Sequence, residues 1–166
     1  MKRLATLAAA TALCLAGANA LAHGDEKHRK PAKAKPMSME EHAFGRQGDP
    51  AKADRTVEVG MSDAMRFSPA EIRVRQGETI RFVVRNGGKV MHEMVLGSLA
   101  ALKEHGEMMK KFPGMEHDEP YMAHVPPGKS QEITWTFTKA GEFHFGCLVP
   151  GHFDAGMIGR IVVAAR

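Results

Sequence analysis

The sequence predicts an all-β protein built as a β-sandwich, and three observations point to this fold class. Apolar and polar residues alternate with a period of two in short runs from residue 55 onward. Glycine-rich turns separate many of these runs. Hydrophobic residues make up 43% of the 166 residues, which is enough to form a core. Short alternating strands of this kind bury one face of each sheet, as the strands of a sandwich do.

The alternating runs place the strands in order along the chain. Gly77 and the Asn86-Gly87-Gly88 segment provide turns after the second and third runs. The expected strands are centred on Val57–Met61, Ile72–Val74, Ile80–Val84, Val90–Leu96, Ile133–Phe137, Phe143–Cys147 and Ile158–Val163.

One segment, 98–129, interrupts the strand pattern and is expected to hold a short helix. Ser98 can cap the helix, and Pro113-Gly114 ends it. His105 is expected to be solvated, and residues 115–129 are expected to be loop. The residues that share one face of this helix are Leu99, Leu102, Met109 and Phe112.

The N-terminal third differs in composition from the rest. Residues 1–22 have a basic start, an uncharged apolar stretch and two alternative small-residue cleavage sites, Ala18-Asn19-Ala20 and Ala20-Leu21-Ala22. This pattern predicts a secretory signal peptide rather than a membrane anchor, because polar sequence follows at once. Residues 23–54 are polar and are expected to be a flexible tail, so the folded domain is expected at 55–166. We therefore expect a periplasmic protein that is not embedded in the membrane.

Charge and cysteine content narrow the function classes. Loss of the signal peptide removes Lys2 and Arg3 and lowers the net charge from +4 to +2, which gives no reason to expect nucleic acid as a partner. It also removes Cys14 and leaves Cys147 alone in an oxidising compartment. Such a thiol is buried, paired with another chain or bound to a metal.

The segment from Gly141 to Met157 carries the chemistry. Cys147, His152 and Met157 are each separated by four residues, and the Pro150-Gly151 turn and Gly156 let the chain fold back. One loop could thus place all three side chains around one point. His92, on a strand distant in sequence, is the candidate for a second imidazole. Two His, one Cys and a weak axial Met form the ligand set of a type 1 copper site.

These residues lie within a wider pattern that resembles the cupredoxin family over roughly residues 55–166. The resemblance implies a Greek-key β-sandwich with copper near one end. It also implies the metal ligands His92, Cys147, His152 and Met157, with no catalytic residues. Its motifs are Phe67-x-Pro69, Ile72-x-Val74-x-x-Gly77, Pro127-Gly128, and the Gly-x-Phe-x-Phe-x-Cys strand that leads into Pro-Gly-His and Gly-Met.

One position departs from the cupredoxin pattern, and two segments add to it. Many cupredoxins have Asn after the first His, where this chain has Glu93, so the hydrogen bonding near Cys147 is open at this level. His92-Glu93-Met94, the 98–129 insert and the tail resemble the periplasmic copper-tolerance cupredoxins, the CopI-like group. Further copper could bind at two sets of residues: Met108, Met109, Met115, His117, Met122 and His124 in the insert, and His23, His28, Met37, Met39 and His42 in the tail.

The first set also has a plainer interpretation, namely core methionines on a helix followed by a solvated loop, and we favour it because Met commonly fills cores. The tail could equally be solvated. The resemblance makes copper tolerance through binding and redox cycling of copper the first functional hypothesis. One-electron transfer between periplasmic enzymes is the alternative. Expected partners are copper ions and a periplasmic redox protein or copper exporter. We expect no enzyme, because the His-x-His and His-Cys-His patterns of multicopper catalysts do not occur.

Overall fold

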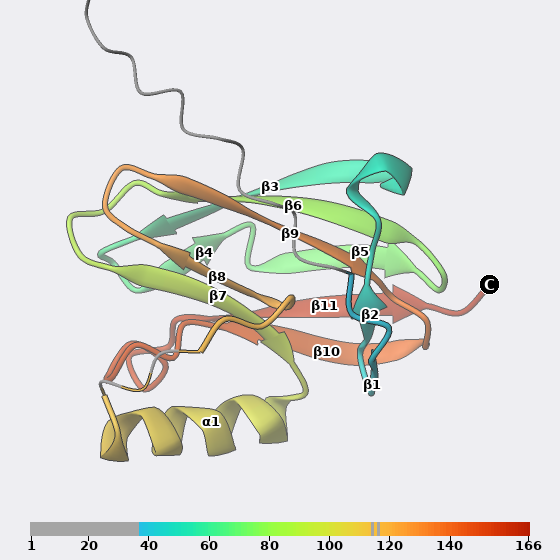
Figure 1. Cartoon of the computed structure of the whole chain (residues 1–166). Coiled ribbons are helices and arrows are strands. Elements are labelled where there is room, and N and C mark those ends of the chain that lie inside the picture. The colour runs from blue at the N-terminus through green and yellow to red at the C-terminus, as the bar shows by residue number, and fades with distance from the viewer. Residues whose placement is uncertain (1–36, 114, 116) are drawn as a thin grey trace, which may run out of the picture. The chain divides into compact units, whose positions relative to one another are not determined.

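The computed structural model describes residues 37–113, 115 and 117–166, which belong to one compact unit. Two β-sheets stack face to face as a sandwich (Figure 1). The first sheet has the order β1-β2-β9-β6-β3-β4 and the second has the order β5-β11-β10-β7-β8. The strands of the first sheet are β1 (Glu41–His42), β2 (Gly45–Gln47), β9 (Ser130–Thr136), β6 (Thr79–Asn86), β3 (Arg55–Ser62) and β4 (Arg66–Ser68). Those of the second are β5 (Glu71–Arg75), β11 (Ile158–Ala164), β10 (Gly141–Gly146), β7 (His92–Gly97) and β8 (Met122–Val125).

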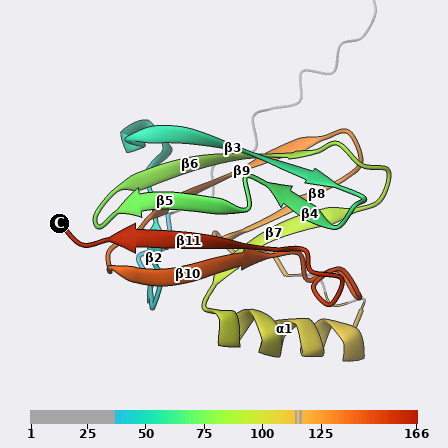
Figure 2. The ribbon, with the colours of Figure 1, turned by 180° about the vertical axis from the view of Figure 1, so that it is seen from behind.

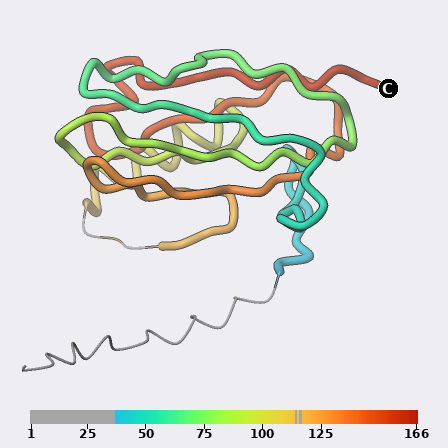
Figure 3. The backbone as a smooth tube through the Cα atoms, turned by 90° about the horizontal axis from the view of Figure 1, so that it is seen from above, coloured from blue at the N-terminus to red at the C-terminus, as the bar shows by residue number. Residues whose placement is uncertain are grey.

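Strands far apart in sequence are neighbours in both sheets, which confirms the predicted all-β Greek-key sandwich. Strand β3 runs parallel to β6, and β5 runs parallel to β11. Figure 3 looks down on the first sheet, where β3, β6 and β9 lie side by side. The loops that join β6 to β7, β8 to β9 and β10 to β11 gather at one end of the sandwich, on the left in Figure 1. The predicted functional loop therefore lies at the end of the sandwich.

The seven expected strands are present, but the structure adds four that the sequence pattern missed. Strands β1, β2 and β4 have three residues or fewer, and β8 lies where a loop was expected. Such short strands carry too few residues to show a period of two. They form by pairing with strands already present at the edge of a sheet: β4 pairs with β3, and β8 pairs with β7.

The expectation of a flexible tail over 23–54 is wrong for residues 41–52. This part forms β1, β2 and the 3₁₀ helix η1 (Pro50–Lys52), and β2 pairs with β9. Phe44 is buried and stacks on Trp135, with ring centroids 5.1 Å apart. The Trp135 Nε1–H also donates to the Phe44 carbonyl oxygen over 2.9 Å. Aromatic packing and strand pairing together thus order a polar segment. The predicted signal peptide and residues 23–36 lie outside the described residues.

The predicted helix is present as α1 (Leu99–Lys111), and Ser98 caps it as expected. The Ser98 Oγ accepts a hydrogen bond from the Ala101 N–H over 3.2 Å. Its buried face was only partly predicted, because Leu99 and Phe112 at its two ends are exposed while Leu102, Gly106 and Met109 are buried. Within the described residues, no helix has the length and apolar character needed to cross a bilayer.

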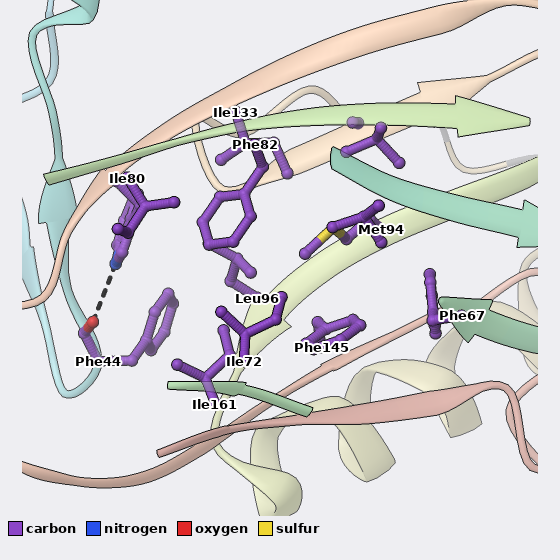
Figure 4. Close-up of a cluster of buried hydrophobic side chains, with 14 of the residues drawn as sticks. Phe44, Phe67, Ile72, Ile80, Phe82, Met94, Leu96, Ile133, Phe145 and Ile161 are labelled. Carbon is purple, nitrogen blue, oxygen red and sulfur yellow. Dashed lines mark hydrogen bonds between the residues drawn. The ribbon is translucent and has the colours of Figure 1, made fainter. Parts of the chain in front are cut away.

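Helix α1 covers the outer face of the second sheet, so the molecule has two hydrophobic clusters. Figure 2 shows the helix outside the sheet that contains β5, β11 and β10. The larger cluster fills the space between the sheets, where Phe82, Met94 and Phe145 meet (Figure 4). The smaller one joins α1 to the second sheet through Val95, Leu102, Met109, Met122 and Leu148. Strand β7 is buried on both faces for this reason.

Candidate metal centre

Three of the four predicted ligands meet at the loop end of the sandwich. The candidate ligand atoms of His92, Cys147 and His152 all lie within 4.8 Å of one another. The Cys147 Sγ is 3.3 Å from Nδ1 of His152 and 4.0 Å from Nδ1 of His92. The Cys147 and His92 side chains are buried. The sulfur and two imidazole nitrogens therefore face a common point.

The loop from Cys147 to Met157 closes on itself through its own backbone. The Met157 N–H donates to the His152 carbonyl oxygen over 3.0 Å, and the Cys147 N–H donates to the Met157 carbonyl oxygen over 3.1 Å. Gly151 and Gly156 both have φ of +88°, a region that favours glycine. Met157 is fully buried beside Cys147 as a result. The loop thus brings the Cys147 thiol and the His152 imidazole together and places Met157 in the core, with its backbone bonded to that of Cys147.

His92 comes from the opposite side of the site, at the start of β7. Its Nε2 is 3.1 Å from Oδ1 of Asp63, whose pKa is lowered chiefly by the hydrogen bond from the Lys89 N–H. Because an ionised carboxylate only accepts hydrogen bonds, Nε2 must carry the proton. This leaves the lone pair on Nδ1, the atom that faces Cys147. Asp63 therefore sets both the orientation of the ring and its binding tautomer.

Buried Asn86 holds the loop that leads into His92. Its amide nitrogen donates to the carbonyl oxygens of Val90 and Val125, each over 2.8 Å, and its side-chain oxygen accepts from the Gly88 N–H. Two of these bonds hold the backbone of the β6–β7 loop, and the third joins that loop to the end of β8. The Asn86 side chain therefore helps to hold this loop in place.

Glu93 supplies the hydrogen bonding near Cys147 that the sequence left open. Its N–H donates to the Cys147 Sγ over 3.4 Å, and its Oε1 accepts from the Leu148 N–H over 2.8 Å. Its Oε2 lies 2.9 Å from Nδ1 of His124. The buried carboxylate thus ties the strand of one imidazole to the loop of the other, and it has a partner for each oxygen.

Burial sets the protonation of the site. It raises the pKa of the Cys147 thiol to about 12, and it lowers the pKa of His152, where the nearby His92 adds to the effect. A neutral imidazole can bind a metal ion through its lone pair, and a buried thiolate is stable only beside a cation. One thiol, two imidazoles and a nearby buried thioether form a soft, largely desolvated donor set. This donor chemistry fits one type 1 copper ion.

The Met and His residues predicted as a cluster in the insert do not share one environment in the structure. Met109 and Met122 belong to the core under α1, as the plainer interpretation predicted, whereas Met108 and Met115 are exposed. His117 and His124 lie together, and His105 is half-buried beside them rather than solvated. Burial lowers the pKa of His105, whereas the contact with Glu93 raises the pKa of His124.

The predicted metal-binding residues of the tail are not gathered in the described part of the chain. Met37 and Met39 are exposed. His42 packs against Phe44, Tyr121 and Trp135, with its ring centroid 5.3 Å from that of Phe44. It is therefore part of the hairpin packing. His23 and His28 lie outside the described residues.

Sequence reasoning missed Asp63 and the full role of Glu93. Asp63 lies 29 residues before His92, in the turn between β3 and β4, and nothing in its local sequence marks it. Glu93 was visible as a departure from a family pattern, but its partners come from β8 and from the loop after β10. Only a folded chain shows such contacts.

Comparison with known proteins agrees with this geometry. Residues 53–164 match the model of the copper-binding proteins of the plastocyanin/azurin family. The copper-resistant cuproprotein CopI of Rubrivivax gelatinosus is 58% identical over 120 residues, covering 72% of this chain and 73% of the relative. CopI of Pseudomonas aeruginosa is 39% identical over 150 residues, covering 73% of this chain and 82% of the relative.

A solved structure supports the fold. The reduced auracyanin of the photosynthetic bacterium Roseiflexus castenholzii superposes with a TM-score of 0.58 at 24% identity, covering 68% of this chain and 98% of auracyanin. Three observations agree: a largely buried His-Cys-His cluster on a two-sheet sandwich, a family match over most of the chain, and relatives at 58% and 39% identity. The chain therefore belongs to the plastocyanin/azurin family of copper-binding proteins and is a cupredoxin of the CopI type.

Proposed function

We propose that this protein holds one type 1 copper ion through His92, Cys147, His152 and Met157. The observation that carries the proposal is the convergence of one buried sulfur and two Nδ1 atoms within 4.8 Å. In this assignment Cys147 would supply the thiolate, His92 and His152 would bind through Nδ1, and Met157 would supply a weaker thioether. When bound, copper supplies a one-electron redox couple.

The surrounding residues hold these ligands in position. Asp63 keeps the proton of His92 on Nε2, and Glu93 holds the Cys147 loop against β7. The hydrogen bond from the Glu93 N–H to Sγ stabilises negative charge on sulfur. Each of these contacts joins one protein group to another, so the ligands are held in position by the fold. A rigid donor set of this kind suits copper in either oxidation state.

We further propose that the protein works in the periplasm in copper tolerance, by binding and redox cycling copper, and that it is not an enzyme. The names of its relatives, copper-resistant cuproproteins, support the first part. The predicted signal peptide supports export. Copper ions are the expected partners, together with a periplasmic redox protein or a copper exporter.

An optical titration tests the site. Cu(II) added to the protein without its signal peptide should produce an intense visible thiolate-to-copper band that saturates at one equivalent. Cys147→Ser should lose the band, whereas His144→Gln, a change on β10 outside the proposed ligands, should keep it. A band that persists in Cys147→Ser would disprove the ligand assignment.

Growth on copper tests the role. Deletion of the gene should lower the copper concentration at which growth stops, and the wild-type gene should restore growth where Cys147→Ser does not. Unchanged growth of the deletion strain at every copper dose would exclude the tolerance role. It would leave the metal site itself in place.

Electron transfer between periplasmic enzymes is the second candidate. The half-buried position of His152 favours it, because one proposed ligand then lies close to solvent at the loop end. In that case a periplasmic cytochrome should reduce the copper-loaded protein rapidly, and the deletion strain should have no copper phenotype. The two experiments together separate the candidates.

A further inference from the structure

A second group of imidazoles lies outside the four proposed ligands. His105 comes from α1, His117 from the segment that leads to β8, and His124 from β8 itself. The ring centroids of His105 and His117 are 4.6 Å apart, and those of His117 and His124 are 6.4 Å apart. Figure 1 shows how this segment runs from the end of α1 back to β8. The fold thus brings three histidines from three elements together.

His124 serves as a tether in this group. Its Nδ1 faces the Glu93 carboxylate at 2.9 Å, and its Nε2 faces the His117 carbonyl oxygen at 3.0 Å. Both partners are acceptors, so both ring nitrogens must donate and neither has a free lone pair. His124 therefore holds the backbone of His117 in place, and the other two rings remain as candidate ligands.

The His105 and His117 rings face each other through nitrogen. Their Nε2 atoms are 2.6 Å apart, so only one proton fits between them and at least one lone pair points into the gap. The Nδ1 of His117 is buried with no hydrogen-bond partner among the described residues. Two imidazoles on one tetrahedral ion hold their nitrogens roughly 3.3 Å apart. A small opening of this pair would therefore admit a metal ion.

Methionines lie around the imidazole pair. Met108 and Met115 line a cavity of about 270 Å³ together with His105 and His117. Both methionines are exposed, so their thioethers are accessible rather than packed in the core. Thioether and imidazole together favour Cu(I) over harder cations.

We propose that His105 and His117 bind a second copper ion as Cu(I), with a thioether from Met108 or Met115 completing the site. Glu93 connects this second site to the first centre. The Glu93 N–H donates a hydrogen bond to the Cys147 Sγ, and the Glu93 carboxylate pairs with His124, which holds the backbone of His117. This site is independent of the type 1 assignment, because it shares no ligand with it.

Anaerobic titration with Cu(I) against a chromophoric Cu(I) chelator tests the proposal on the full mature chain. His105→Gln and His117→Gln should each bind one copper ion fewer than the wild type. Both should keep the visible band with Cu(II), which shows that the fold and the first centre are intact. The N-terminal segment is the same in every variant, so any copper that it binds cancels in the comparison.

His144→Gln is the matched control. His144 also has a buried Nδ1 without a partner among the described residues, but it faces no second imidazole in that part of the chain, so this variant should bind as much Cu(I) as the wild type. Replacing Met108 and Met115 together by Leu should weaken the second ion at least about tenfold. His124→Gln, which keeps a donor, should weaken the second ion less than His124→Ala does.

The outcomes are distinguishable. If His105→Gln and His117→Gln both bind as many copper ions as the wild type, with the same affinity, the second site is overturned. The imidazole pair would then be a structural hydrogen bond only. Unchanged affinity in the methionine double variant would overturn the thioether part. Cys147→Ser should lose the visible band and keep the second ion, so failure of the first centre is recognised separately.

Discussion

At the scale of single residues, Glu93 has the most consequential contacts at the site. A buried carboxylate is costly unless its oxygens are bonded. Here Oε1 accepts from the Leu148 N–H and Oε2 faces His124, so the cost is offset by two charge-assisted contacts. The same side chain then fixes the distance between β7 and the Cys147 loop. The expected departure at this position thus places a residue whose two carboxylate oxygens bind two different partners.

Glu93→Ala should weaken copper binding at the first centre about 10–100-fold, because the loop loses its tie to β7. Glu93→Gln should weaken it less, because the amide oxygen can still accept from Leu148. Competition titration with a copper chelator measures both. Glu132→Ala removes an exposed carboxylate that pairs with Arg81, and it should have no effect. Equal affinities in Glu93→Ala and Glu132→Ala would show that the link is unimportant.

At the scale of elements, the β1–β2 hairpin is held by aromatic packing and by strand pairing. Phe44 lies between the two short strands and packs on Trp135, while β2 adds its backbone to the edge of β9. The hairpin lies at the end of the sandwich opposite the metal loops (Figure 1). It extends the first sheet, and its contribution should appear in stability rather than in copper binding.

Phe44→Ala should lower the free energy of unfolding by about 3 kcal/mol, because a buried ring is replaced by a cavity. Urea unfolding followed by fluorescence reports on this directly, since Trp135 is the one tryptophan of the chain and touches Phe44. Met39→Ala, in the same segment but exposed, should change stability by less than about 0.5 kcal/mol. An unchanged free energy in Phe44→Ala would favour the flexible tail predicted from composition.

At the scale of the whole molecule, the sandwich works as a rigid frame that brings separate loops to one end. The β6–β7 loop leads into His92 at the start of β7, and the β10–β11 loop presents Cys147, His152 and Met157. Both loops start from strands buried in the core, so their relative position is set by the packing of the sheets. A metal ion bound between them would cross-link strands that are more than fifty residues apart in sequence.

Copper should therefore stabilise the folded protein. With free Cu(II) held a hundredfold above its dissociation constant, the gain should be at most about 2.7 kcal/mol, because only the folded state brings the proposed ligands together. Thermal unfolding without Cu(II) and with Cu(II) held at that free concentration measures the shift. Cys147→Ser, which lacks the thiolate, should show little of it. An equal rise in Tm for this variant would mean that copper stabilises the protein from another place.

Local features were readable from the sequence because their causes are local. The period of two marks strands of five residues or more, and Ser98 marks the start of α1 through a hydrogen bond made three residues away. Cys147, His152 and Met157 are close in sequence, so a turn suffices to bring them together. His92 was assigned through a family resemblance, because its position 55 residues from Cys147 gives no local signal.

What the sequence determined by itself is an all-β chain with a thiol, an imidazole and a thioether on one loop. The tertiary structure decided which distant groups surround them: Asp63 behind His92, Glu93 against the Cys147 loop, and His105 facing His117. The tertiary structure also decided that Phe44 helps to order residues 41–52, whose composition predicts a flexible tail. The physical reason is that these contacts depend on strand pairing and sheet packing, which bring together residues whose own neighbours in sequence carry no trace of the partner.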